Sequence, residues 1–305
     1  MSFIAQEKLL LELLFDDTIR KRFINDTQAV LANYDLEQHE KNDFKTIRLE
    51  ALEVDASMRR HLFLSHLCLS LPVTFSLLSS FENGIALLKE IVNAELMLAH
   101  PLERATLFGS KIREQLPALP NANAKEHSLI TAIVEAELGM VWTATSLKKH
   151  VLEQGMPENI TNDNNSDWST QPIKLASFVS AAMLPQPYSQ LKQKLCPKDK
   201  CDIWTELTQK PLKAVRRSKV LSNEDPRLLI AQATVSHYSA CEPAIDHQTV
   251  ELSEGFAHLF QHINGTSSID QLLTAFKQAG APAPLLNSVK AGFKNLVDKN
   301  ILIVA

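Results

Sequence analysis

The chain has 305 residues, of which 45% are hydrophobic and 22% charged, so its composition is that of an ordinary globular protein with room for two domains. Its net charge of -4 argues against a general nucleic-acid binder, and its four cysteines are too few to imply a disulfide framework. The N-terminal segment carries acidic residues within its apolar run, which makes it a poor signal peptide, and we expect a cytoplasmic protein.

Residues 1–152 are predicted to form a helical bundle. Apolar residues recur there at three- and four-residue spacing, as between Leu9 and Leu14 and again at Val30. The last helix of the region ends at Gly155, a residue suited to the left-handed conformation that closes many helices. Short connections between such helices favour an antiparallel arrangement.

The longest segment without a formal charge runs from His61 to Phe81, which is about the length of a membrane span. Two histidines, one threonine and five serines lie within it, and Pro72 interrupts it. A single span of this polarity would insert poorly into a membrane. We therefore expect two buried bundle helices that meet at Pro72, the second beginning there, and no membrane partner.

The pattern of residue types changes after residue 152. Residues 153–171 are polar and rich in Asn and Asp, and they are expected to form a linker or exposed loop. Residues 172–305 are expected to form a smaller α+β region. Alternation and β-branched residues predict short strands within residues 172–185, 213–221 and 228–240 and at 248–252.

Three helices and a terminal strand are predicted to follow, the first helix ending at Asn264-Gly265. The second opens with Ser268 three residues before Gln271, which is a capping-box pattern. Strands, three helices and a final strand form a winged-helix-like order. The fold class is therefore mainly α with a smaller α+β part, ending in a winged-helix-like domain at about residues 226–305.

No pattern in the sequence predicts catalysis or a metal site. His258 and His262 have the i, i+4 spacing of a ligand pair, but a third ligand of suitable spacing is not evident. Cys196 and Cys201 could be half of a zinc site, but no second half follows. We expect no catalytic residue, metal ion or cofactor in this chain.

The N-terminal half resembles a family of partner proteins. The segment FKTIRLEALEVDASMRRHLFLSHLCLSLPVTFSLL, residues 44–78, resembles the helical domain of the MbnC/TglI-like partner proteins of multinuclear iron oxidative enzymes. Those enzymes modify cysteines in ribosomally made peptides. The likeness rests on a helix with Arg59 and Arg60 that runs into the element LPVTF, and it covers about residues 9–150.

The segment HQTVELSEGFAHLFQHINGTSSIDQLL, residues 247–273, separately resembles the PqqD-like winged-helix domain called the RiPP recognition element. It also looks like the regulatory domain of some protein methyltransferases. The first likeness implies that a leader peptide adds as a strand to the sheet edge and packs on the third helix. The implied peptide-binding residues are Gln248, Thr249, Val250, Val289, Lys290, Phe293 and Lys294. For Val289 and Phe293 a place in the core is an open alternative.

Charge separates two possible partners of the winged helix. Residues 228–305 contain four Lys and no Arg against six acids, which disfavours DNA. Between Lys192 and Lys219 nine basic residues face three acids, which suits an acidic leader peptide or an acidic face of a partner enzyme. A merely solvated surface is an equally open alternative. The expected contacts to an acidic partner are Arg59, Arg60, Lys213, Arg216 and Arg217.

The resemblance implies a non-catalytic subunit of RiPP natural-product biosynthesis. It would form a heterodimer with an iron-dependent oxidative enzyme through the helical region, with the iron in the partner. It would also bind the leader of a ribosomally synthesised precursor peptide and present a peptide cysteine for modification. The alternatives are a winged-helix DNA-binding regulator and a regulatory module of another protein-modifying enzyme.

Overall fold

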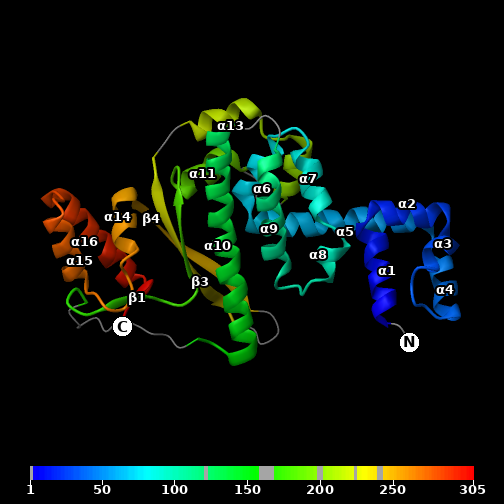
Figure 1. Ribbon diagram of the computed structural model, residues 1–305, viewed down its shortest axis with the longest axis horizontal. Helices are drawn as coiled ribbons and strands as arrows, with labels where there is room; N and C mark the ends of the chain where they lie inside the picture. The colour runs from blue at the N-terminus through cyan, green and yellow to red at the C-terminus, as the bar shows by residue number, and fades with distance from the viewer. Residues whose placement is uncertain (1–2, 120–122, 158–167, 198–201, 223–224, 239–242) are drawn as a thin grey trace. The chain divides into compact units, whose positions relative to one another are not determined.

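The computed structural model describes residues 3–119, 123–157, 168–197, 202–222, 225–238 and 243–305 (Figure 1). Of the structure described, 64% is helix and 13% is sheet, which confirms the mainly α class with a smaller α+β part. The chain forms two compact units, Met1–Asn123 with Leu195–Arg217 (unit 1) and Ala124–Lys194 with Ser218–Ala305 (unit 2). The boundary at residue 152 was expected to separate the domains, but the last long helix of the predicted bundle belongs to unit 2.

Unit 1 is helical throughout its described part. Its elements are α1 Phe3–Phe15, α2 Asp17–Asn25, α3 Thr27–Leu31, α4 Gln38–Lys45, α5 Leu49–Ser70, α6 Pro72–Ser79, α7 Gly84–Ile91, α8 Ala94–Leu98, α9 Arg104–Gln115, the short 3-10 helix Leu116–Ala118 and α12 Ile203–Gln209. Helix α13, Ala214–Leu221, begins in unit 1 and ends in unit 2.

The predicted joint at Pro72 is confirmed. Helices α5 and α6 meet at Leu71 with a bend of 115°. Pro72 is the first residue of α6, a position whose N–H makes no hydrogen bond within the helix, so the missing N–H of proline costs nothing there. Every residue of α6 is buried within the protein. In the described chain no single helix is long and apolar enough to cross a membrane, and only the bent pair reaches that length and apolarity together.

Helix α6 forms the centre of the core of unit 1. Phe75 is fully buried, stacks on Phe108 at a centroid distance of 5.6 Å and meets the edge of Trp204 at 5.7 Å. Trp204 lies on α12, which Asp202 opens by accepting a hydrogen bond from the Thr205 N–H. These aromatic contacts explain why a segment from the second half of the sequence packs in unit 1.

Unit 2 combines a long helix, a small sheet and three C-terminal helices (Figure 1). Its elements are α10 Ala124–Gln154, β1 Ile173–Leu175, β2 Val179–Leu184, α11 Tyr188–Leu195, β3 Arg227–His237, β4 Ala244–Ser253, α14 Glu254–Phe260, α15 Ile269–Gln278, α16 Ala283–Asp298 and β5 Leu302–Val304. The sheet has the order β2-β3-β4 and is antiparallel, while β1 pairs separately with β5.

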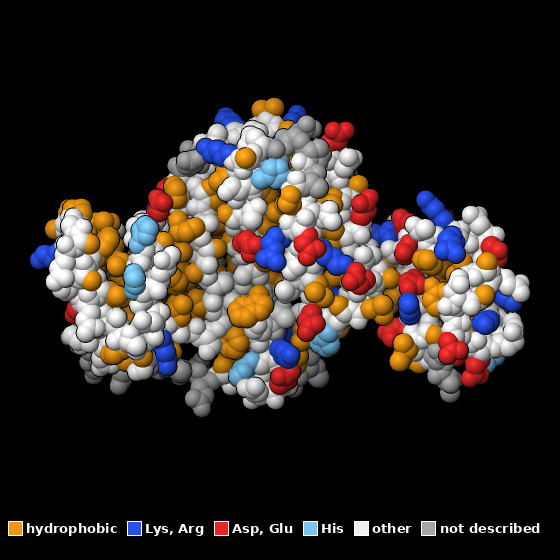
Figure 2. Space-filling view, viewed as in Figure 1, with side chains coloured by type: hydrophobic (Ala, Val, Ile, Leu, Met, Phe, Trp, Pro, Cys, Tyr) orange, Lys and Arg blue, Asp and Glu red, His pale blue; other side chains and the backbone are white. Residues whose placement is uncertain are grey.

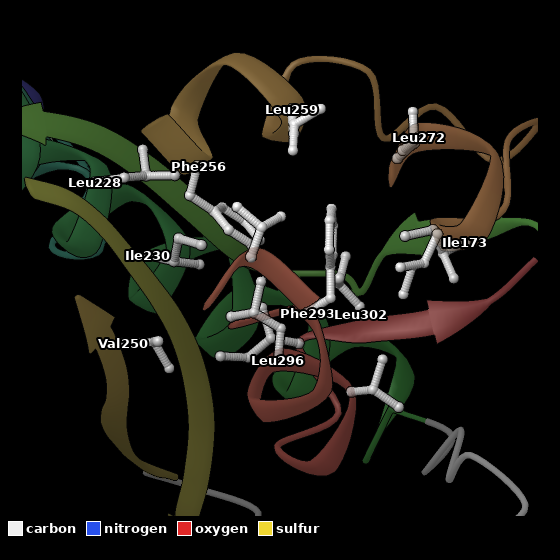
Figure 3. Packing of buried hydrophobic residues seen from close by; sticks show 14 residues of the cluster. Ile173, Leu228, Ile230, Val250, Phe256, Leu259, Leu272, Phe293, Leu296 and Leu302 are labelled. Carbon is white, nitrogen blue, oxygen red and sulfur yellow. The ribbon is translucent and has the colours of Figure 1, made fainter. Parts of the chain in front are cut away.

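The two faces of the β2-β3-β4 sheet pack on different helices. Ala233 on β3 contacts Leu147 and Val151 of α10, whereas Leu228 and Ile230 point to the other face. There they join a core built with α14, α15 and α16, in which the labelled side chains converge between helices and strands (Figure 3). The sheet is therefore a layer between α10 and the three C-terminal helices.

Most of the predicted elements of this region are confirmed. Strands β1 and β2 lie within 172–185, β3 covers most of 228–240, and β4 includes 248–252. Three helices and a strand follow as expected, and α15 opens with the predicted capping box of Ser268 and Gln271. Of the predicted linker, residues 158–167 lie outside the described residues.

The strand predicted at 213–221 is wrong, because these residues form α13. Val215 and Val220 are the β-branched residues of this segment; Val215 is 81% exposed, whereas Val220 is buried. The buried positions Arg217 and Val220 are three residues apart, which is the spacing of one helical face. Helical burial of Arg217 could not be expected from an apolar pattern.

Candidate functional site

Strand β4 lies at the edge of the three-stranded sheet and, among the described strands, pairs with β3 alone. The N–H of Ala233 on β3 donates to the Phe178 carbonyl on the β2 side at 3.0 Å. Residues alternate in the direction of their backbone groups along an antiparallel strand, so Gln232 faces β4, where it pairs with Gln248. The N–H and C=O groups of Thr249 therefore point away from the sheet.

The same alternation directs the backbone groups of His247 and Glu251 outward. An edge strand with outward N–H and C=O groups is a template on which another extended chain can pair. We call the outward backbone of His247, Thr249 and Glu251 the β4 edge. The carbonyl oxygen of Thr249 is already reached by Lys299 Nζ at 3.4 Å, so the end of α16 lies beside this edge.

The three predicted strand contacts differ in their actual roles. Gln248 Nε2 donates to the Lys299 carbonyl at 2.9 Å and also bonds the Gln232 side chain, so Gln248 ties α16 to the sheet. Val250 is 4% exposed and belongs to the core of unit 2. Of the predicted three, only Thr249 presents outward backbone groups, so the prediction that Gln248 and Val250 bind the peptide is corrected.

The predicted contacts on α16 divide in the same way. Val289 and Phe293 are 1% and 0% exposed, and the Phe293 ring packs at 4.6 Å from the ring of Phe256 (Figure 3). Their side chains are core, so the predicted contact of these two residues with a peptide is corrected. Lys290 and Lys294 are exposed, and Lys290 Nζ lies 3.6 Å from a carboxylate oxygen of Asp270.

Sequence reasoning missed His247, Glu251 and Lys299. His247 Nε2 lies 2.8 Å from the Met140 carbonyl of α10, a distance at which the ring N–H donates to that oxygen, and burial lowers the pKa of this histidine. Glu251 accepts a hydrogen bond from the Ser189 N–H at 2.8 Å, next to the start of α11. The period-two alternation of β4 was the signal that could have identified the odd-numbered residues.

Two of the arginines predicted to contact an acidic partner are structural. Arg60 Nη2 donates to the Phe15 carbonyl at 2.8 Å, and its guanidinium pairs with Asp17 at 3.1 Å. Arg217 is 4% exposed, lies 3.7 Å over the ring of Phe81 and donates to Ser80 Oγ at 2.9 Å. Both side chains are used within unit 1, so the prediction that they contact a partner is corrected.

The other three predicted basic contacts lie on the surface. Arg59 is exposed and pairs with Asp55 one helical turn away, at 2.9 Å. Lys213 and Arg216 are exposed at the start of α13. These residues retain the accessibility that contact with a partner requires.

Metal binding would require several His, Cys, Asp or Glu side chains to converge within the part of the chain that the structure describes. No group of three or more His, Cys, Asp or Glu in that part of the chain is arranged to hold a metal ion. His258 lies on α14 but His262 lies beyond its end, and Cys201 lies outside the described residues. The buried carboxylate of Glu137 accepts a hydrogen bond from the Tyr188 hydroxyl at 2.7 Å, which joins α10 to α11.

Comparisons of the chain with models of known protein families, with curated protein sequences and with solved structures gave no match. Among the described residues, unit 2 has a strand edge at β4 that lies beside the end of α16. An extended peptide can pair on such an edge.

Proposed function

We propose that this chain is a non-catalytic partner subunit that binds the leader of a ribosomally synthesised precursor peptide through a RiPP recognition element. The observation that carries the proposal is the β4 edge. Strand β4 is followed along the chain by α14, α15 and α16, which is a winged-helix-like order. Main-chain pairing on an open edge gives affinity for an extended segment, and neighbouring side chains select among segments.

The bound peptide would run antiparallel or parallel to β4 and pair with His247, Thr249 and Glu251. Lys299 would release the Thr249 carbonyl, because a 3.4 Å contact from an amine is a weak competitor for a strand N–H. Lys294 on the exposed face of α16 would attract acidic residues of the leader. Val289 and Phe293 support the site from the core and do not touch the peptide.

We also propose that this chain binds a partner enzyme. The likeness of residues 9–150 to the MbnC/TglI-like partner proteins supports a complex with an iron-dependent oxidative enzyme. The iron would be held by that enzyme, and this chain would present a cysteine of the precursor peptide to it. Arg59, Lys213 and Arg216 are available on the surface for an acidic face of the enzyme.

DNA binding is supported less well by the same features. A DNA-reading helix needs several exposed cationic side chains, but α16 carries only Lys290 and Lys294, and Lys290 Nζ lies 3.6 Å from Asp270. On the face shown in Figure 2, basic and acidic side chains are interspersed and form no continuous basic field. A regulatory module of another protein-modifying enzyme would use the same β4 edge, with a different partner.

Titration calorimetry with the full chain tests the peptide half of the proposal. The probes are synthetic peptides that cover the N-terminal halves of any short open reading frames that lie beside the gene. Thr249→Pro removes the outward N–H without touching the β3 ladder, and Thr249→Val keeps that N–H. One lost hydrogen bond plus the proline ring at the edge should weaken binding by at least about tenfold, while the valine variant binds within about threefold.

Two results would refute the peptide site. The first is that none of the peptides binds the wild-type chain. The second is that the proline and valine variants bind a peptide equally well, because the peptide would then pair elsewhere.

A further inference from the structure

One side of α16 lies along strand β4. Leu285, Gly292 and Lys299, which caps the helix, are seven residues apart, and seven residues make almost two helical turns, so the three share that side. A Cβ added at Gly292 would lie 3.5 Å from the Leu252 side chain of β4. At the end of the helix, the Lys299 carbonyl accepts a hydrogen bond from the Gln248 side chain of β4. This side of α16 therefore follows β4 from Leu252 to Gln248.

Two glutamine side chains hold the end of α16 against the sheet. Gln248 Nε2 donates to the Lys299 carbonyl at 2.9 Å, and Gln232 Nε2 donates to the Asn300 carbonyl at 3.3 Å. Gln232 and Gln248 are cross-strand partners on β3 and β4, and their side chains also bond each other. Asn300 then turns the chain out of the helix with a φ of 55°. The backbone of Lys299 is thereby fixed beside the β4 edge.

The ammonium group of Lys299 contacts the outward backbone of β4. Lys299 Nζ lies 3.4 Å from the Thr249 carbonyl oxygen, which is a group that an added strand would use. Among the described residues this ammonium makes no ion pair. Ser288 and Asn295, the polar residues on the same side of α16, are uncharged. A lysine beside an edge strand is one of the devices by which proteins prevent unwanted strand pairing.

An added strand would send its side chains to the two faces of the sheet in turn. Val250 belongs to the core beside α16, so the neighbouring Thr249 side chain points to the other face, which α10 covers. The peptide residue aligned with Thr249 would point the same way, and the peptide residues directly before and after it would point to the α16 face. Those two neighbours lie on the face from which Lys299 reaches the edge.

We propose that Lys299 selects leader peptides that carry Asp or Glu directly before or after the residue aligned with Thr249. A peptide N–H takes the Thr249 carbonyl, and the displaced ammonium binds the carboxylate by a charge-assisted hydrogen bond. A leader with neutral residues at both positions offers no such partner and competes with Lys299 for the carbonyl. The inference rests on the proposed function and deepens it, because it names the chemical class of leader that the β4 edge accepts.

Titration calorimetry with the full chain and the leader peptides tests the selection. In a leader that binds, each Asp or Glu is changed in turn to Asn or Gln. One such change, or two changes two positions apart, should lower the affinity for the wild-type chain by about fivefold or more. The same change should alter the affinity for Lys299→Met by less than about twofold, because the cation is gone. Lys277→Met removes an equal charge from an exposed position on α15 and should keep the full effect.

A second comparison measures the protection of the edge. The amide leader should bind Lys299→Met at least as tightly as it binds the wild-type chain, whereas the unchanged leader should bind Lys299→Met less tightly. Lys299→Glu should prefer a leader with Lys at the selected position over the unchanged leader.

Three results would overturn the role of Lys299 and leave the proposed function standing. They are a leader that binds but loses no affinity when its acids are replaced, an acid effect that persists in Lys299→Met, and an acid effect that Lys277→Met also removes. If no leader binds the wild-type chain, this inference and the peptide half of the proposed function both fall.

Discussion

Replacing Phe293 with alanine tests whether the face of α16 that carries Phe293 belongs to the core of unit 2 or to a peptide-binding surface. Phe293 is 0% exposed, and its ring lies 4.6 Å from the ring of Phe256. Truncation of a buried phenylalanine costs about 3–5 kcal/mol, of which a tilted aromatic pair supplies about 0.5–1.5 kcal/mol. Such a loss is a large part of the roughly 5–15 kcal/mol that stabilises a typical domain. The matched surface change Lys294→Ala should stay within about 0.5 kcal/mol.

Urea denaturation monitored by hydrogen exchange and mass spectrometry suits this comparison, because peptides from β3 and α16 report on the unfolding of unit 2 alone. We expect the Phe293→Ala midpoint to fall strongly and the Lys294→Ala midpoint to stay near the wild type. A Phe293→Ala loss under about 1 kcal/mol, together with a large loss of leader affinity, would refute the reasoning. The ring would then face a bound peptide, and the packing around Phe256 would be misassigned.

Three further changes have defined outcomes. A Cβ at Gly84 would lie 1.8 Å from a backbone carbonyl oxygen, so Gly84→Ala should cost about 3 kcal/mol or more in thermal unfolding, whereas Gly255→Ala, with its nearest atom at 3.8 Å, should be neutral or stabilising. Arg217→Ala should cost about 2–4 kcal/mol by urea denaturation, because a buried cation over an aromatic ring and its hydrogen bonds are lost, and Arg216→Ala should cost under about 0.5 kcal/mol. Burial lowers the pKa of His247 in the folded chain below its ordinary value of about 6.5. As the pH falls below that ordinary value, the unfolded chain binds a proton that the folded chain does not, so the free energy of unfolding decreases. His247→Gln should flatten this part of the curve of stability against pH.

Local chemistry explains which elements the sequence could predict. A proline acts on its own turn, so Pro72 was enough to place the start of α6. Ser268 and Gln271 satisfy each other's backbone groups within four residues, so the start of α15 needed no tertiary information. In both cases the stabilising partners lie within one helical turn of the residue that signals them.

The roles of the arginines depended on residues far away in the sequence. Arg60 pairs with Asp17, 43 positions earlier, and Arg217 bonds Ser80, 137 positions earlier. A row of basic residues in a sequence is therefore consistent both with a charged surface and with buried cations whose partners come from distant helices. Only the fold separates Arg217, which is buried, from its exposed neighbour Arg216.

Membership in the two units was set by the same kind of long-range contact. The apolar periodicity of α10 predicts a helix correctly, but it does not say that Leu147 and Val151 pack on Ala233 of β3. In the same way, Trp204 on α12 packs on Phe75, although the two residues are far apart in the sequence. A helix can be recognised from its own residues, whereas the surface that it covers depends on what the rest of the chain offers.

At the candidate peptide site, a shift of one residue along β4 decides whether a backbone group points outward or toward β3. The predicted contacts Gln248, Thr249 and Val250 are consecutive, yet consecutive residues of a strand send their side chains to opposite faces and their backbone groups to opposite edges. A run of three can therefore contain both outward and inward positions, and here Thr249 alone is outward. The hydrogen bond from the Ala233 N–H to the Phe178 carbonyl, which belongs to a different strand pair, shows that the odd-numbered residues of β4 are the outward ones. A test of the site must accordingly alter backbone groups at odd-numbered positions, and Thr249→Pro is the substitution that does so while leaving the β3 ladder in place.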